Sequence, residues 1–118
     1  MKCWEYKGDE VMKIYISGAI SGVDNYEECF RKAEEYLTEE GWEVLNPTGI
    51  KVDNLTYEQY MELDLKLLDY ADAIYMLEGW ENSKGANREY GYALAKNKLI
   101  VKENLYGHIN HSGATSEP

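Results

Sequence analysis

Two carboxylates occupy unusual positions in this sequence, and Asp64 is the first of them. Residues 56–70 have helical periodicity, and at 100° per residue their apolar side chains fall on one arc of the helix surface. Asp64 lies near the middle of that arc, whereas most charged residues of the segment lie opposite. A carboxylate among apolar side chains is costly unless it is paired, hydrogen-bonded or protonated. The pattern therefore indicates either a structural Asp bonded to backbone amides or a functional group.

Glu89 is the second unusual carboxylate, because it lies one turn inside a helix predicted over 85–96, just after the polar loop 82–85. A helix N-terminus offers free backbone N–H groups and the positive end of a dipole to an anion, and Ser83 would add a hydroxyl. A carboxylate in such a field is expected to stay ionised and is suited to act as a nucleophile. The alternative is an ordinary first-turn Glu that pairs with a nearby Lys or Arg.

A run of small residues after the first predicted strand is a third candidate for ligand contact. Residues 16–22 read Ile-Ser-Gly-Ala-Ile-Ser-Gly, and their small side chains let a ligand approach the backbone closely. The run is not GxGxxG, and no acidic residue ends the strand predicted over 42–45 where a dinucleotide fold would use one. The sequence therefore argues against NAD binding.

The elements that must position these residues alternate between strand and helix. Strands are predicted over 13–17, 42–45, 73–77 and 99–101, and helices over 26–40, 56–70 and 85–96. This alternation predicts a three-layer α/β domain of the flavodoxin-like or Rossmann-like type, with a parallel sheet of about four strands in the order 2-1-3-4. Sheets of this kind bind ligands at the carboxyl ends of their strands.

The predicted domain occupies residues 12–106. Residues 1–11 are a polar N-terminal extension, and residues 107–118 are small and polar, which predicts a disordered tail. His108 and His111 fall in that tail, so we expect no catalytic histidine.

Composition narrows the possible partners and compartments. The formal net charge of −10 argues against nucleic acid, because non-specific affinity for it comes from Lys and Arg. Cys3 and Cys29 are the only cysteines and form no CxxC motif, so we expect reduced thiols and no bound metal. Neither a membrane-spanning run nor a signal-peptide core is found, which predicts a cytoplasmic protein without a membrane partner.

Four segments together resemble the nucleoside 2-deoxyribosyltransferase superfamily over roughly residues 12–101. They are YISGAISG at the end of the first strand, the helix with Asp64 before LKLLDYAD, the strand AIYML, and SKGANREYGYALAKNKLI. The chain looks like the small phage and bacterial members of this superfamily and is similar to the 2′-deoxynucleoside 5′-monophosphate N-glycosidases. The resemblance implies that Glu89 attacks the anomeric carbon and that Asp64 acts near the leaving base.

The resemblance also implies a set of substrate-binding residues. Ser83 stands six residues before Glu89, as the phosphate-binding serine of the monophosphate N-glycosidases does, whereas base transferases usually carry an aspartate there. Those hydrolases have a serine and an arginine in the first loop where this chain has Ala19 and Ser21, and Lys84 or Arg88 would have to compensate. The substrate-binding residues implied in this way are Tyr15, Ser17, Gly18, Ala19, Ser21, Gly22, Ser83 and Gly85.

The function expected from these observations is cleavage or transfer of an N-glycosidic bond in a (deoxy)nucleoside or a nucleoside 5′-monophosphate. The reaction would pass through a covalent glycosyl–Glu89 intermediate and would need no cofactor. The main alternative is an inactive module that binds or sequesters a nucleotide or a nucleotide-derived signal. A third, weaker alternative is a structural or host-interaction protein of a phage.

A homo-oligomer is expected from a count of the faces of the sheet. In the order 2-1-3-4 the first helix lies on one face and the two later helices lie on the other. The last two strands would then expose Ile, Leu and Val side chains, which a dimer with two-fold symmetry would bury. The alternative is that residues 1–11 fold back over this face with Trp4 and Tyr6.

Overall fold

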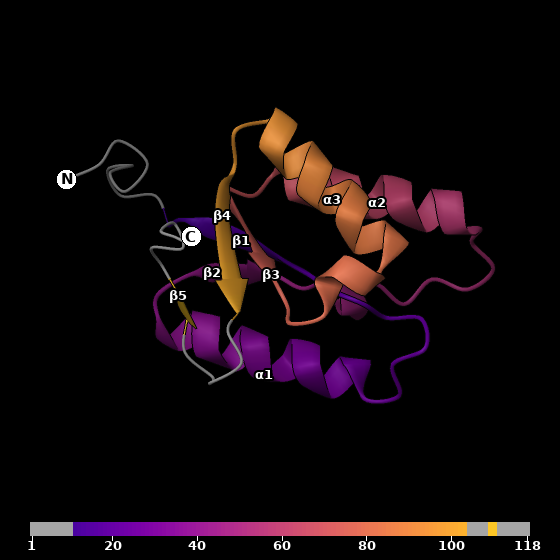
Figure 1. Cartoon of the computed structure of the whole chain (residues 1–118), viewed down its shortest axis with the longest axis horizontal. Coiled ribbons are helices and arrows are strands. Elements are labelled where there is room, and N and C mark those ends of the chain that lie inside the picture. The colour runs from indigo at the N-terminus through magenta and orange to yellow at the C-terminus, as the bar shows by residue number, and fades with distance from the viewer. Residues whose placement is uncertain (1–10, 104–108, 111–118) are drawn as a thin grey trace.

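A parallel sheet forms the middle layer of the computed structural model, which describes residues 11–103 and 109–110 (Figure 1). Its strands are β1 (Lys13–Ser17), β2 (Glu43–Leu45), β3 (Ala73–Met76) and β4 (Leu99–Glu103). Their order is β2-β1-β3-β4, and the three pairings are parallel, which confirms the predicted fold class. In this register Tyr15 of β1 pairs with Leu45 on one side and with Ile74 on the other.

A fifth strand, β5 (Ile109–Asn110), pairs antiparallel with β4 and extends the sheet beyond the predicted order. It lies within residues 107–118, for which the sequence predicts disorder, so that prediction does not hold at these two residues. The remaining residues of the expected tail, and residues 1–10 of the expected extension, lie outside the described part of the chain.

Helices cover the two faces of the sheet unequally, as the crossovers require (Figure 1). Helix α1 (Tyr26–Glu39) packs on one face, and helices α2 (Tyr57–Asp69) and α3 (Lys84–Ala95) pack on the other. Side chains of β1 alternate between the two cores: Ile14 and Ile16 point to the α1 side, and Tyr15 points to the α2–α3 side. The period of two also turns Ser17 toward α3.

The helices that carry the candidate residues begin at well-formed caps. The predicted capping box of α2 is present: Thr56 Oγ1 accepts the N–H of Gln59, and the Gln59 side chain accepts the N–H of Thr56. Helix α3 begins after Ser83, whose Oγ accepts the N–H of Ala86 at 3.1 Å. These caps fix where the first turns of α2 and α3 lie, and so fix the positions of the carboxylates further along each helix.

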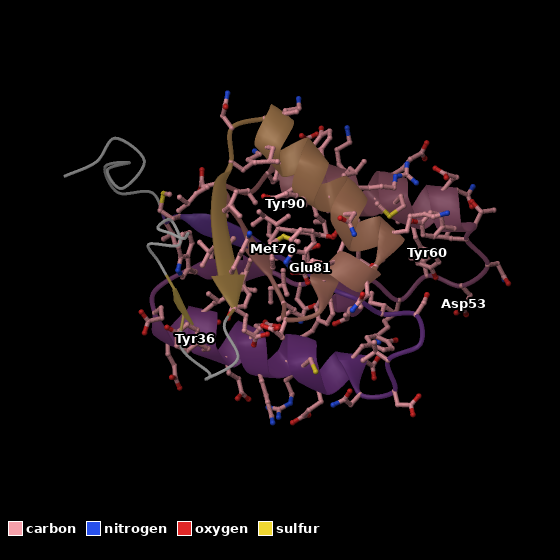
Figure 2. The ribbon with its side chains drawn as sticks, in the orientation of Figure 1. Tyr36, Asp53, Tyr60, Met76, Glu81 and Tyr90 are labelled. Carbon is pink, nitrogen blue, oxygen red and sulfur yellow. The ribbon has the colours of Figure 1, made fainter. Side chains whose placement is uncertain are left out.

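The expected exposed patch on β3 and β4 is absent from the described residues. Tyr75, Leu77 and Val101 on the α1 side of the sheet are buried. Long aromatic side chains, including Tyr36 of α1 (Figure 2) and Trp42, pack against this cluster and cover more sheet than a bare helix count allows. The apolar side chains that do remain exposed lie mainly on α2 and near it: Val52, Tyr57, Tyr60, Leu63 and Tyr70.

Membrane insertion finds no support among the described helices, since none combines the length and the apolar character of a membrane span.

Candidate active site

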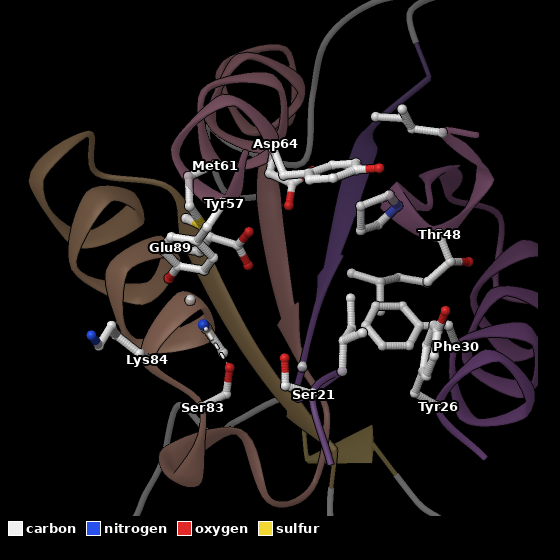
Figure 3. A pocket seen from close by; sticks show the side chains of 18 of the residues that line it. Ser21, Tyr26, Phe30, Thr48, Tyr57, Met61, Asp64, Ser83, Lys84 and Glu89 are labelled. Atoms are coloured by element: carbon white, nitrogen blue, oxygen red, sulfur yellow. Dashed lines mark hydrogen bonds between the residues drawn. The ribbon is translucent and has the colours of Figure 1, made fainter. Parts of the chain in front are cut away.

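A pocket of about 710 Å³ opens at the carboxyl end of β1 (Figure 3). One wall is formed by α2 and the start of α3, and the opposite wall by α1 and the 3₁₀ turn η2 (Pro47–Gly49). The volume is typical of a small-molecule site, and its place matches the ligand crevice of parallel α/β sheets.

Glu89 lies at the inner end of the first wall and is only 5% exposed. Two hydroxyl groups from β1 hold its carboxylate. The Tyr15 hydroxyl donates to Oε2 at 2.8 Å, and the Ser17 hydroxyl donates to Oε1 at 2.6 Å. Burial, followed by the charges of Glu89 and Asp64, raises the pKa of Tyr15 well above its usual value, so the phenol remains a proton donor. Both oxygens of the carboxylate are thus fixed from the strand side.

Asp64 reaches the same place from α2, and its carboxyl group lies within hydrogen-bonding reach of Glu89. Figure 3 shows the two carboxyl groups facing one space in the pocket. Glu89 is the side chain whose hydrogen bonding affects the pKa of Asp64. The residue that breaks the apolar arc of α2 thus faces Glu89 across the pocket.

The two carboxyl groups have raised pKa values. Burial raises the pKa of Glu89 to about 7, and the charge of Asp64 adds to this, while the hydrogen bonds from Ser17 and Tyr15 oppose it. Burial also raises the pKa of Asp64 to about 6, and the hydrogen bond with Glu89 opposes that rise. The pair therefore releases its two protons near neutral pH and shares one proton between the two steps.

The expectation that the helix N-terminus keeps Glu89 ionised is wrong for the free protein. Removal of the carboxylate from water outweighs the dipole of α3, so its pKa moves up and not down. The alternative of an ordinary first-turn Glu fails as well, because the neighbouring Arg88 pairs with Glu58 on the surface, 3.2 Å away. Arg88 is also absent from the residues that line the pocket.

The first turn of α3 forms the part of the pocket next to Glu89. Ser83, Lys84 and Gly85 line it, and Ser83 does so while capping the helix. The Lys84 ammonium points away from the space between the two carboxyl groups (Figure 3). A Cβ at Gly85 would approach Met61 Sδ to 3.4 Å, so a larger residue would intrude on α2. This turn presents a hydroxyl and backbone N–H groups, but no inward cation.

The loop after β1 contributes fewer contacts than the sequence predicts. Gly18 and Ser21 line the pocket, whereas Ala19 and Gly22 do not. Gly18 is required by packing, since a Cβ there would lie 2.8 Å from Leu77 Cδ1. Ser17 is likewise absent from the lining, because its side chain is turned to Glu89 and not to the pocket.

The opposite wall of the pocket is not among the residues predicted from the sequence. Tyr26, Phe30 and Thr48 lie across the pocket from Glu89 (Figure 3), and Pro47 and Ile50 also line it. The aromatic residues of α1 fit a core-facing stripe, and the Asn-Pro pair before Thr48 directly follows the strand predicted over 42–45. The signal that was available is the turn chemistry of Asn46, whose side chain accepts the N–H of Thr48 at 3.0 Å.

Metal coordination has no candidate ligand set in the described part of the chain, where no three His, Cys, Asp or Glu side chains are grouped suitably.

The fold and the site define the class of protein as a three-layer α/β domain with a ligand pocket at the carboxyl end of the first strand of its parallel sheet. Residues 12–102 match the family described as "Domain of unknown function (DUF4406)", and the chain belongs to that family. No curated protein matches the sequence.

Two solved structures share the fold. A conserved protein from Enterococcus faecalis V583 superposes with a TM-score of 0.62 at 18% identity, over 79% of this chain and 63% of that one. The CMP N-glycosidase BcmB from Clostridium botulinum superposes with a TM-score of 0.57 at 23% identity, over 76% of this chain and 69% of that one. This chain thus spans less than two thirds of the length of the Enterococcus protein. At these identities the likeness establishes the fold.

Proposed function

We propose that the chain cleaves or transfers the N-glycosidic bond of a (deoxy)nucleoside or nucleoside 5′-monophosphate. The observation that carries this proposal is the buried Glu89 with the half-buried Asp64 beside it in the pocket, and two hydroxyl donors on Glu89. Support also comes from the fold of BcmB, which is a CMP N-glycosidase.

The proposed reaction uses the two carboxyl groups in different protonation states. A carboxylate oxygen of Glu89 bonds to the anomeric carbon while the bond from that carbon to the base nitrogen breaks. The electron pair leaves with the base, which takes a proton from Asp64. Water then adds its hydroxyl to the anomeric carbon and its proton to Asp64, which frees Glu89; a second base in place of water gives transfer.

The proposed reaction needs Glu89 ionised and Asp64 protonated, and the pair holds a single proton near neutral pH. Tyr15 and Ser17 donate to Glu89, and a donated hydrogen bond stabilises the ionised form of a carboxyl group. Burial nevertheless keeps the pKa of Glu89, about 7, above that of Asp64, about 6, so in the free protein the shared proton lies mainly on Glu89. The proposal therefore requires this proton to move to Asp64 when the substrate binds.

The substrate is expected to bind with its sugar next to Glu89 and its base toward Tyr26 and Phe30 on the opposite wall. A 5′-phosphate would meet the first turn of α3, where Ser83, Lys84 and Gly85 line the pocket together with Ser21 of the loop after β1. Base release is tested by chromatography of the purified protein with a panel of ribo- and deoxynucleosides and their 5′-monophosphates. Wild-type turnover that is absent from Glu89→Gln supports the proposal; the absence of any released base from the whole panel contradicts it.

A nucleotide-binding module without catalysis is the second candidate, and the sparse cation content of the pocket favours it. Ala19 and Ser21 stand where the monophosphate N-glycosidases have Ser and Arg, and Lys51 is engaged by Glu27 at 3.1 Å. Calorimetry on the same panel separates the two functions. Tight binding with no released base identifies a binding module.

We also propose that the chain forms a homo-oligomer, through α2 and not through the open sheet face. Tyr60, Leu63 and Tyr70 are 36%, 39% and 64% exposed, and at 100° per residue they share one side of α2. Tyr60 also lines the pocket, so a partner on this side would lie close to its mouth. Light scattering at micromolar concentration tests this: a dimer mass that Leu63→Lys reduces supports it, and a monomer mass overturns it.

A further inference from the structure

Ser17 is a buried polar residue that contacts Glu89 but does not line the pocket. It ends β1, it is 1% exposed, and it is absent from the pocket lining although it neighbours residues that belong to it. Its hydroxyl donates to Glu89 Oε1 at 2.6 Å, the shorter of the two hydrogen bonds that reach this carboxylate. Ser17 therefore contacts the carboxylate from behind, where a substrate does not compete for it.

We propose that Ser17 is a positioning residue, which fixes the orientation of the Glu89 carboxylate and favours its ionised form over its protonated form. This role rests on the proposed function, in which Glu89 is the nucleophile. Tyr15 and Ser17 are two residues apart on β1, so their side chains emerge on the same face of the sheet and reach the two oxygens separately. Two donors on two oxygens stop the carboxylate from rotating about its Cγ–Cδ bond.

The two donors differ in what else they do. Tyr15 belongs to the lining of the pocket and Ser17 does not, although both side chains are buried. Loss of the Tyr15 hydroxyl would disturb binding and chemistry together. Loss of the Ser17 hydroxyl is expected to affect the carboxylate and leave substrate binding intact, and this difference makes the role testable.

Among the described residues, the titratable groups that act on Glu89 are Asp64 from α2 and Tyr15 from β1. Tyr57 of α2 and Lys84 of α3 are further titratable residues that line the pocket. Neither Asp64 nor Tyr15 changes when Ser17 is replaced, so a shift in the titration of Glu89 reports the lost hydroxyl. Ser17→Ala removes the donor with the smallest change in volume, and Ser17→Cys keeps the shape with a weaker donor. Thr38→Ala removes an exposed hydroxyl from α1 and serves as the matched control.

The first measurement needs no substrate. Carbon-13 NMR of Glu-labelled protein follows the Glu89 carboxyl, which is assigned by its loss in Glu89→Gln. Ser17→Ala is expected to raise the Glu89 midpoint by about one pH unit, as loss of a hydrogen bond to a charged group predicts. Ser17→Cys is expected to fall between Ser17→Ala and the wild type, and Thr38→Ala to match the wild type. A Ser17→Ala midpoint equal to that of the wild type overturns the proposal, as does a larger shift in Ser17→Cys than in Ser17→Ala.

The second measurement uses turnover of a substrate from the panel. Ser17→Ala is expected to lower kcat about tenfold at neutral pH, leave KM unchanged, and move the acid limb of the pH profile upward, because more alkali is needed to ionise Glu89. A loss confined to KM would assign Ser17 to substrate binding and overturn the proposal. If the wild type releases no base from any substrate, the proposed function fails, while the NMR titration still decides the role of Ser17.

Discussion

The two walls of the pocket are built in different ways. The wall of β1, α2 and α3 holds polar groups in defined contacts, with the buried Tyr15 and Ser17 and the half-buried Asp64 around Glu89. The wall of α1 and η2 is mainly apolar, with Phe30 and Pro47 buried and other side chains half-buried or exposed. A buried polar network carries a desolvation cost, whereas an apolar wall can accept many ligands. Under the proposed function, the first wall would carry the chemistry and the second would select the substrate.

The largest effect is expected from Glu89→Gln, which tests whether the polar wall performs the chemistry. The substitution is nearly isosteric but removes the nucleophile, so turnover should fall at least about a thousandfold. Base release measured by chromatography checks this, with circular dichroism to confirm the fold. Undiminished turnover in a folded Glu89→Gln protein would remove Glu89 from the reaction.

A smaller loss of activity is expected from Asp64→Asn. The amide cannot donate an acidic proton to the leaving base, so kcat should fall about a hundredfold, with less loss on substrates whose leaving group needs no proton. The same change removes a charge that raises the pKa of Glu89, so the Glu89 midpoint should move down. An upward shift, or equal losses on all leaving groups, would show that Asp64 has another role.

Ionisation of the buried Glu89 should also lower the stability of the folded protein as the pH rises. The folded pKa of Glu89 is about 7 against an ordinary value of 4.5, so the native state binds more protons than the unfolded chain in this interval. Stability linked to this group is therefore full below about pH 4.5 and is lost as the pH rises through 7, with a total change of about 3 kcal/mol.

Thermal unfolding of wild type and Glu89→Gln between pH 5 and pH 8 tests this expectation. The inactive variant should gain in Tm relative to wild type as the pH rises. A constant difference would show that the buried carboxyl group does not titrate in this range.

The smallest effect is expected from the apolar wall. Ile50 lines the pocket in the loop after η2, and Ile50→Ala removes about 1 kcal/mol of apolar contact, which should raise KM about fivefold with kcat unchanged. Steady-state kinetics check the split, with Thr38→Ala as the variant outside the pocket. A fall in kcat at constant KM would contradict the division of labour between the walls.

The sequence predicts one wall far better than the other, for a physical reason. Asp64 breaks a helical period, and Glu89 follows a helix start, so both stand out from their local pattern. Phe30 obeys its pattern, because a side chain that closes a pocket and one that fills a core follow the same helical spacing. The direction of the Ser17 side chain depends on how α3 packs on β1, and this tertiary packing cannot be read from a local sequence pattern.

The strand order 2-1-3-4 is predictable because handed crossovers leave few choices for short alternating elements. The burial of the β3–β4 face is not predictable from the sequence, because it depends on how far side chains such as Tyr36 extend from α1 over the sheet. Likewise, the sequence around β5 has no apolar alternation that would predict its antiparallel pairing with β4.

The cap at Ser83 fixes how far along helix α3 the Glu89 carboxylate lies. Glu89 is the sixth residue after the Ser83 cap, which at 1.5 Å per residue is about 9 Å along the helix axis. A substitution between these two positions leaves the distance between Ser83 and Glu89 along the helix axis unchanged. One inserted or deleted residue would shift the carboxylate along the axis and swing it about 100° around the helix, away from Tyr15 and Ser17. The number of residues between Ser83 and Glu89 is thus a stricter requirement than the identity of their exposed side chains.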